Sequence, residues 1–200
     1  DKKIVTYRVI YGSLYDEISK AIQIIRPAMV IMGTHGATGM QKIFGSHIEK
    51  IVAGSSSPLL ITRGATELKD MKTIVMPFSF QINSLQITTF AASMAKKFGA
   101  TIHLVAHHDN NEVHEEAIAN NQKIVERFME ENEVAFEIIN LPMKKSFDSE
   151  LQDYAGSIHA DVIASAYSND NKLITNAHMQ KIFQNIYKIP VLTVNAEELA

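Results

Sequence analysis

A glycine-rich segment at residues 33–47 has the residue types and spacing to bind an anion. Four glycines fall within thirteen positions, at Gly33, Gly36, Gly39 and Gly45, and Ser46 follows the last of them. Glycine has no Cβ, so the backbone there can turn sharply and approach a ligand closely. Consecutive N–H groups at a helix start, with Ser46 as N-cap, would bind an anion. The segment predicts a phosphate site, with tight turns and helix packing as the alternative reason for the glycines.

Histidines form the second group of candidates. His35 could contact a phosphate or exchange a proton near neutral pH, but stabilisation of the loop is the role we expect. Four more, accompanied by Asp109 and Glu112, are His103, His107, His108 and His114. Imidazole and carboxylate groups can hold zinc, yet adjacent residues of an extended chain point to opposite sides. We therefore expect a solvated loop, and a metal site remains the alternative.

Composition excludes several classes of function. The 200 residues carry a net charge of −3, which lacks the basic excess expected of a nucleic-acid-binding protein. The chain has no cysteine, so disulfides, thiolate metal sites and cysteine nucleophiles are ruled out. No apolar stretch approaches the roughly 18 residues of a membrane span. We expect a cytoplasmic protein without nucleic-acid or membrane partners. No paired carboxylates, serine–histidine–aspartate order or nucleophile elbow indicates a hydrolase.

Short apolar runs alternate with segments of helical period, as in parallel strands joined by crossover helices. The class is therefore α/β. Strands are predicted at 4–11, 28–33, 58–62, 73–77, 101–106, 135–141, 161–165 and 190–194. Helices are predicted at 14–26, 42–53, 84–98, 112–131, 147–159 and 176–187. Met71, Met76, Met94 and Met129 are expected to fill the core.

The sequence repeats itself. The segment from Ser13 to Ile31 aligns with that from Ser146 to Ala164 at an offset of 133, and Pro58 aligns with Pro190 at 132. We predict two domains in tandem: residues 1–66, called the first copy, and residues 70–200, called the second copy. Only the second copy has room for a complete set of elements, and the matching start of the first would lie about 60 residues before Asp1. We therefore expect the first copy to be a C-terminal half that packs against the second copy or another chain and covers Val5, Val9, Val30 and Ile31. The alternative is that the missing segment is present but disordered.

The glycine segment resembles the signature of the universal stress proteins. Their pattern is glycine, two residues, glycine, nine residues, glycine, then serine or threonine; here Gly33, Gly36, Gly45 and Ser46 follow it with eight residues in the long gap. The resemblance implies a Rossmann-like, doubly wound, five-stranded parallel sheet in each tandem domain, as in the related adenine nucleotide α-hydrolases. It also implies a homodimer through the last strand and, in a subset of members, ATP or a related adenine nucleotide, with or without Mg.

The resemblance also implies roles for individual residues. Met32, Gly33 and Gly36 match residues beside the ribose and phosphates, and Gly45, Ser46 and His47 match those that hold the phosphates. The family's nucleotide binders have two further contacts, an aspartate after the first strand and a backbone group on the second, which would precede Asp1. The truncated chain by itself could therefore also be without a cofactor.

The second copy departs from the signature. Its first strand ends in Met76-Pro77-Phe78-Ser79 without an acidic residue, and residues 165–177 contain no glycine. Close approach of the backbone to a phosphate is then sterically difficult. We predict a structural or dimerising role for this copy.

The sequence favours a regulatory stress-response protein that binds ATP in its first copy without dedicated turnover. The alternative is an interaction module that binds no nucleotide. A third hypothesis, an enzyme related to the adenine nucleotide α-hydrolases, would need product formation that depends on Gly33 or Ser46. Slow hydrolysis of bound ATP stays open.

Overall fold

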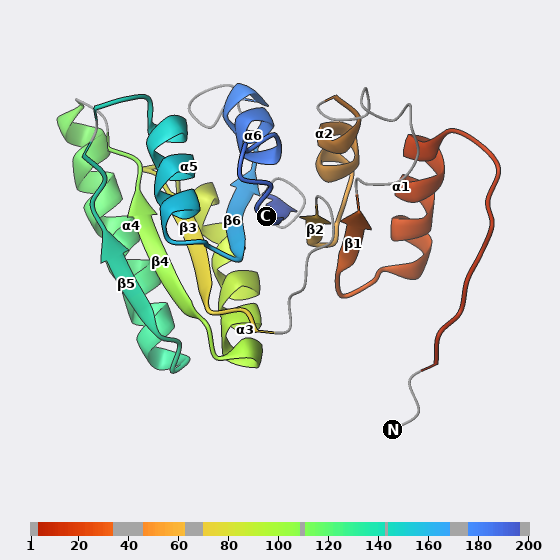
Figure 1. Ribbon diagram of the computed structural model, residues 1–200, viewed down its shortest axis with the longest axis horizontal. Helices are drawn as coiled ribbons and strands as arrows, with labels where there is room; N and C mark the ends of the chain where they lie inside the picture. Colours follow the sequence, from red (N-terminus) through yellow and green to blue (C-terminus); the bar gives the residue numbers. More distant parts are fainter. Residues whose placement is uncertain are drawn as a thin grey trace.

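The fold was obtained as a computed structural model, which describes residues 4–33, 46–62, 70–108, 111–142, 144–168 and 176–196. The helices are α1 (Leu14–Ile25), α2 (Ser46–Ala53), α3 (Thr88–Phe98), α4 (Glu112–Glu131), α5 (Phe147–Ser157) and α6 (Asn176–Phe183), with a 3₁₀ helix η2 (Ile82–Ile87) before α3. The strands are β1 (Val30–Gly33), β2 (Leu59–Thr62), β3 (Thr73–Phe78), β4 (Thr101–Ala106), β5 (Phe136–Ile139), β6 (Val162–Tyr167) and β7 (Val191–Asn195). Figure 1 shows the second copy as the larger body, with β1, β2, α1 and α2 beside it.

All the strands join one seven-stranded sheet in the order β1-β2-β7-β6-β3-β4-β5. Neighbours pair in parallel except β2 and β7, which run antiparallel. The α/β, doubly wound prediction is confirmed. The second copy contributes five strands and the first copy adds β1 and β2 to the same sheet, so the count is seven rather than five.

The seam between β2 and β7 joins the two copies. Leu59, Leu60 and Ile61 lie opposite Thr193, Leu192 and Val191. Beside the seam, the Asn195 side chain donates a hydrogen bond to the carbonyl oxygen of Ala53 at 2.6 Å. The expectation that the first copy packs against the second is confirmed, and the pairing occupies the outer edge of β7.

Both faces of the sheet are covered over most of its width. Strand residues such as Ile74 and Met76 pack with α3 and α4, while their neighbour Val75 packs with α5 and α6 on the opposite face. The α5 and α6 face continues across the seam to α1 and α2 through Ile22, Ile48 and Leu59. The four methionines expected in the core are buried on the α3 and α4 side of the sheet.

The cover predicted over the first copy is incomplete. Val5, Val9 and Ile31 are 90%, 75% and 68% exposed, and Val30 is partly buried. Ile31 lies opposite Leu60, whose side chain is in the core on the α3 and α4 side. Among the described residues, that layer of helices does not reach β1, so the expectation that all four side chains are covered was wrong.

Some predicted elements differ from the structure because a strand needs a neighbouring strand and because local hydrogen bonds set where a helix begins. Residues 4–11 are extended but form no strand, because no described neighbour supplies a ladder of hydrogen bonds. The helix predicted at 84–98 begins instead as η2, where the Ser84 hydroxyl donates to the carbonyl of Gln81 at 2.6 Å. The helix predicted at 147–159 ends at Ser157, and His159 takes a left-handed conformation with φ +51°.

Candidate functional site

The predicted phosphate segment leaves the carboxyl end of β1 and enters α2. This is the edge of a parallel sheet where open α/β folds bind ligands. Met32 and Gly33 are the last residues of β1, and Ser46 and His47 are the first residues of α2. Ser46 is thus one position inside the helix rather than its N-cap. The side chains of Ser46 and His47, and all of His35, Gly36 and Gly45, lie outside the described part of the structure.

Gly33 occupies a place where the fold does not require glycine. Its φ is not positive, and an added Cβ would meet only the Thr62 Oγ1 atom, at 3.7 Å, an ordinary contact. Gly33 lies opposite Thr62 just as Ala166 lies opposite Val194 in the second copy. The matching position of the second copy therefore carries a Cβ. A reason other than backbone conformation has to account for the glycine in β1.

Packing fixes the two ends of the segment relative to each other. Ile48, Ile51 and Val52 of α2 are buried in the same core that Met32 of β1 packs against. The end of α2 is held further by the hydrogen bond from Asn195 to Ala53. The first turn of α2 is therefore held near the carboxyl end of β1.

In the second copy, polar groups at the corresponding edge are used by the chain itself. The Ser79 backbone N–H, just after β3, donates to the Ser84 hydroxyl at 3.0 Å. The Asn121 side chain of α4 donates to the Ser79 carbonyl at 2.8 Å. These buried bonds close the end of β3 from within.

A largely buried carboxylate at the start of α5 is bonded to two side chains of α6. His178 is 6% exposed and its Nδ1 donates to Asp148 Oδ1, while Lys181 Nζ donates to Asp148 Oδ2 at 2.7 Å. Burial acts to raise the pKa of Asp148, but the hydrogen bonds and charges of His178 and Lys181 outweigh it and hold that pKa below its ordinary value. His178 Nε2 is buried without a hydrogen-bond partner.

Sequence reasoning missed this cluster, although one signal was present. His178 and Lys181 are three residues apart, the spacing that places two side chains on one helix face. Nothing in the sequence pairs them with Asp148, thirty residues earlier. That pairing depends on the packing of α5 against α6.

The histidines considered for a metal site have separate partners. His103 shares a 2.6 Å hydrogen bond with Tyr154, and His108 donates to Glu115 at 2.6 Å. The His107 ring stacks on Phe147 with centroids 4.1 Å apart, and the His114 ring stacks on Phe80 at 3.7 Å. No three metal-ligating side chains gather within the described ranges. His103 belongs to β4 and His114 to α4, so the prediction that all four lie in a loop was wrong.

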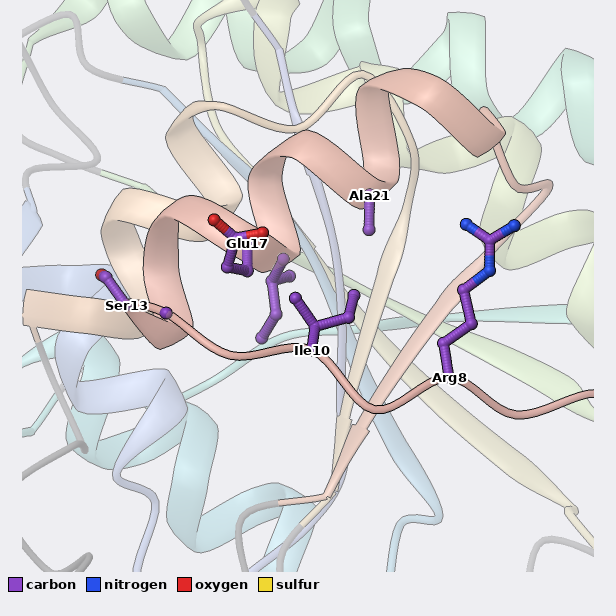
Figure 2. A pocket seen from close by; sticks show the side chains of 7 residues that line it. Arg8, Ile10, Ser13, Glu17 and Ala21 are labelled. Carbon is purple, nitrogen blue, oxygen red and sulfur yellow. The ribbon is translucent and has the colours of Figure 1, made fainter.

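Two cavities occur away from the end of β1. One, of about 270 Å³, lies between the extended segment and α1. Figure 2 shows Ile10 directed toward that helix, with Glu17 and Ala21 on the helix side and Arg8 farther along the segment. The other, of about 430 Å³, lies between the end of β5 and α5 and includes Tyr154. Neither is lined by a residue predicted for the phosphate site.

Within the described ranges, the structure contains no helix with the length and apolar character of a membrane span.

Comparison with known proteins gives the family of the N-terminal part and the fold of the whole. The sequence model of the universal stress protein family matches residues 1–63. No curated protein matches the sequence. A universal stress protein structure from Archaeoglobus fulgidus superposes with a TM-score of 0.66 at 16% identity, covering 91% of this chain and 66% of that one.

Other solved structures agree on the fold. A putative universal stress protein from Pseudomonas aeruginosa UCBPP-PA14 gives a TM-score of 0.61 at 14% identity, covering 94% of this chain and 71% of its own. A second Archaeoglobus fulgidus universal stress protein gives 0.51 at 16% identity, covering 62% of this chain and 93% of its own. The chain thus spans just under two thirds of the length of the first Archaeoglobus fulgidus protein and almost all of the length of the second.

Proposed function

We propose that the first copy, whose sequence matches the universal stress protein family over residues 1–63, binds an adenine nucleotide through the segment between β1 and α2. ATP is the nucleotide we favour. The phosphates would lie at the first turn of α2, where backbone N–H groups and the positive end of the helix dipole attract an anion.

The observation that carries the proposal is the glycine at the end of β1. The backbone does not require it, and the second copy has Ala166 at the matching position. A glycine without a conformational reason is explained if a ligand passes close to the backbone there. Met32, Gly33 and Gly36 would then lie along the ribose and phosphates, and Gly45, Ser46 and His47 would hold the phosphates, with or without Mg.

The proposed role is regulatory binding rather than turnover. Nucleotide binding would change the shape or the contacts of the protein, in a cytoplasmic stress response. A homodimer is part of this proposal, but β7 already pairs with β2, so the dimer would use a surface other than the last strand.

Calorimetric titration of Mg-ATP into the natural protein tests the proposal. We expect micromolar binding, and Gly33→Ala should weaken it about tenfold or more while the unfolding midpoint stays unchanged, because the added Cβ has room in the unliganded fold. The matched pair is Ser46→Ala and Asn176→Ala, at the first residues of α2 and α6. Only Ser46→Ala should weaken binding. Equal affinities for wild type, Gly33→Ala and Ser46→Ala would rule out this site.

A second candidate is an association module that binds no nucleotide. Exposed apolar side chains support it: Val5 and Val9 of the extended segment and Ile31 of β1 offer apolar surface to a partner. Absence of any nucleotide binding, together with concentration-dependent association in light scattering, would favour this function instead.

A further inference from the structure

The first turns of α5 and α6 converge on a single carboxylate. Asp148 lies in the first turn of α5, and both side chains that reach it, His178 and Lys181, belong to α6. Each helix start adds partial positive charge. Imidazole, ammonium and two helix N-termini together form an environment that favours an oxyanion.

The imidazole has a hydrogen-bonding capacity that the chain does not use. His178 is more than nine-tenths buried, and its Nε2 has no hydrogen-bond partner among the described residues. In a helix the side chain leans toward the N-terminus, so the ring of His178 lies over the first turn of α6. A buried polar atom without a partner is uncommon. The other ring nitrogen, Nδ1, is the one that reaches Asp148.

The internal repeat shows what is special about Asp148. Buried residues of α2 at 48, 51 and 52 match those of α6 at 179, 182 and 183, so His47 occupies the sequence position of His178. The aligned starts of α1 and α5 place Tyr15 at the position of Asp148. The second copy therefore has a carboxylate at a position where the first copy has none.

We propose that the first turns of α5 and α6 form an oxyanion site that the second copy fills with its own Asp148 carboxylate. Asp148 stands in for a bound carboxylate or phosphate group and keeps the site closed to external anions. The inference goes beyond nucleotide binding by the first copy and does not depend on it.

Chemical rescue by small anions tests this inference on the whole chain. In Asp148→Ala the carboxylate is replaced by a space lined by His178 Nδ1 and Lys181 Nζ. We expect the melting temperature to fall by about 10 °C, because a buried charged partner is lost. Sodium formate or inorganic phosphate, exchanged for chloride at constant ionic strength, should restore at least about half of that loss in a saturable way.

Two controls separate a built site from a general salt effect. Asp153→Ala removes a carboxylate from the same helix, one that pairs with Lys145 at 2.7 Å on the surface, and formate should not stabilise it. The double variant Asp148→Ala with His178→Gln should lose the rescue. Lack of any saturable effect of formate and phosphate on Asp148→Ala, or equal effects on Asp153→Ala, would overturn the inference.

The test remains decisive if Asp148→Ala is unfolded in chloride. The titration is then followed by circular dichroism, and formate or phosphate should fold the variant. Asp148→Ser, which leaves a smaller space, gives the same comparison in a second variant. If neither variant is folded or stabilised by either anion, Asp148 is a structural ion-pair partner only.

Discussion

Gly156 is a position where a single methyl group would meet an aromatic ring. An added Cβ would lie 2.6 Å from ring atoms of Tyr187, well inside van der Waals contact. The hydroxyl of Tyr187 donates to Asp153 at 3.3 Å, which holds the ring over the last turn of α5. Glycine is thus required here by a neighbour rather than by its own backbone angles, unlike the reason proposed for Gly33.

The effect of Gly156→Ala on the free energy of unfolding should therefore depend on whether Tyr187 is present. In the wild-type background we expect it to destabilise the protein by about 1 kcal/mol, because Tyr187 has to move away. In a Tyr187→Ala background the clash is gone, and the same change should stabilise by up to about 1 kcal/mol through the better helix propensity of alanine. Urea unfolding of the four proteins measures this cycle, and a cost that persists without Tyr187 contradicts the explanation.

The lowered pKa of Asp148 makes stability depend on pH in a defined direction. A carboxylate with a lower pKa in the folded than in the unfolded protein stabilises the fold above its ordinary pKa of about 3.9. That contribution disappears as the pH falls through the lowered folded value. Asp148→Asn should be less stable than wild type at pH 6. The difference between their free energies of unfolding should become smaller below about pH 4. Asp153→Asn, on the exposed surface, should differ less from wild type in free energy of unfolding. A difference for Asp148→Asn that stays constant between pH 6 and pH 2.5 contradicts the prediction.

At the scale of elements, local sequence patterns predicted the bounds of several helices and strands of the second copy. The helix predicted at 112–131 has those bounds because Asn111 caps it, its side chain accepting from the backbone N–H groups of Val113 and His114. Apolar runs such as 73–77 and 101–106 became central strands with little change. Contacts between distant elements were not predictable in the same way: the segment 4–11 has strand composition but no neighbour, and the Asp148 cluster requires two helices to meet. Of the predicted phosphate site, the sequence located the end of β1 and the start of α2, while the segment between them lies outside the described residues.

The seam and the edge of the sheet should respond differently to truncation of a side chain. Leu60 lies on β2 opposite Leu192 and is buried, whereas its other neighbour in register, Ile31 of β1, is largely exposed. Leu60→Ala should cost about 2–5 kcal/mol, because it leaves a cavity in the core, and Ile31→Ala less than about 1 kcal/mol. Urea unfolding gives both values, and similar costs at the two sites would mean that β2 is not part of the common core.

At the scale of the whole molecule, the two copies are joined into one sheet and share one of its covered faces. The core on the α5 and α6 side runs without a break from Phe147 and Leu151 to Ile22 and Ile48. The opposite core includes Leu60 of the first copy beside Leu192 and Val194 of the second. Sequence repetition predicted two units, but it gave no sign that their last strands would pair antiparallel. That arrangement depends on which edges are left free after each unit folds.

The seam between β2 and β7 also orders events during synthesis. β2 is synthesised well before its antiparallel partner β7. Pairing of strands so far apart in sequence is slow, and an unpaired apolar strand is prone to aggregate while it waits. The edge of β2 that faces β7 therefore stays open until β7 has been made, which makes this strand a natural point of contact for a chaperone in that interval.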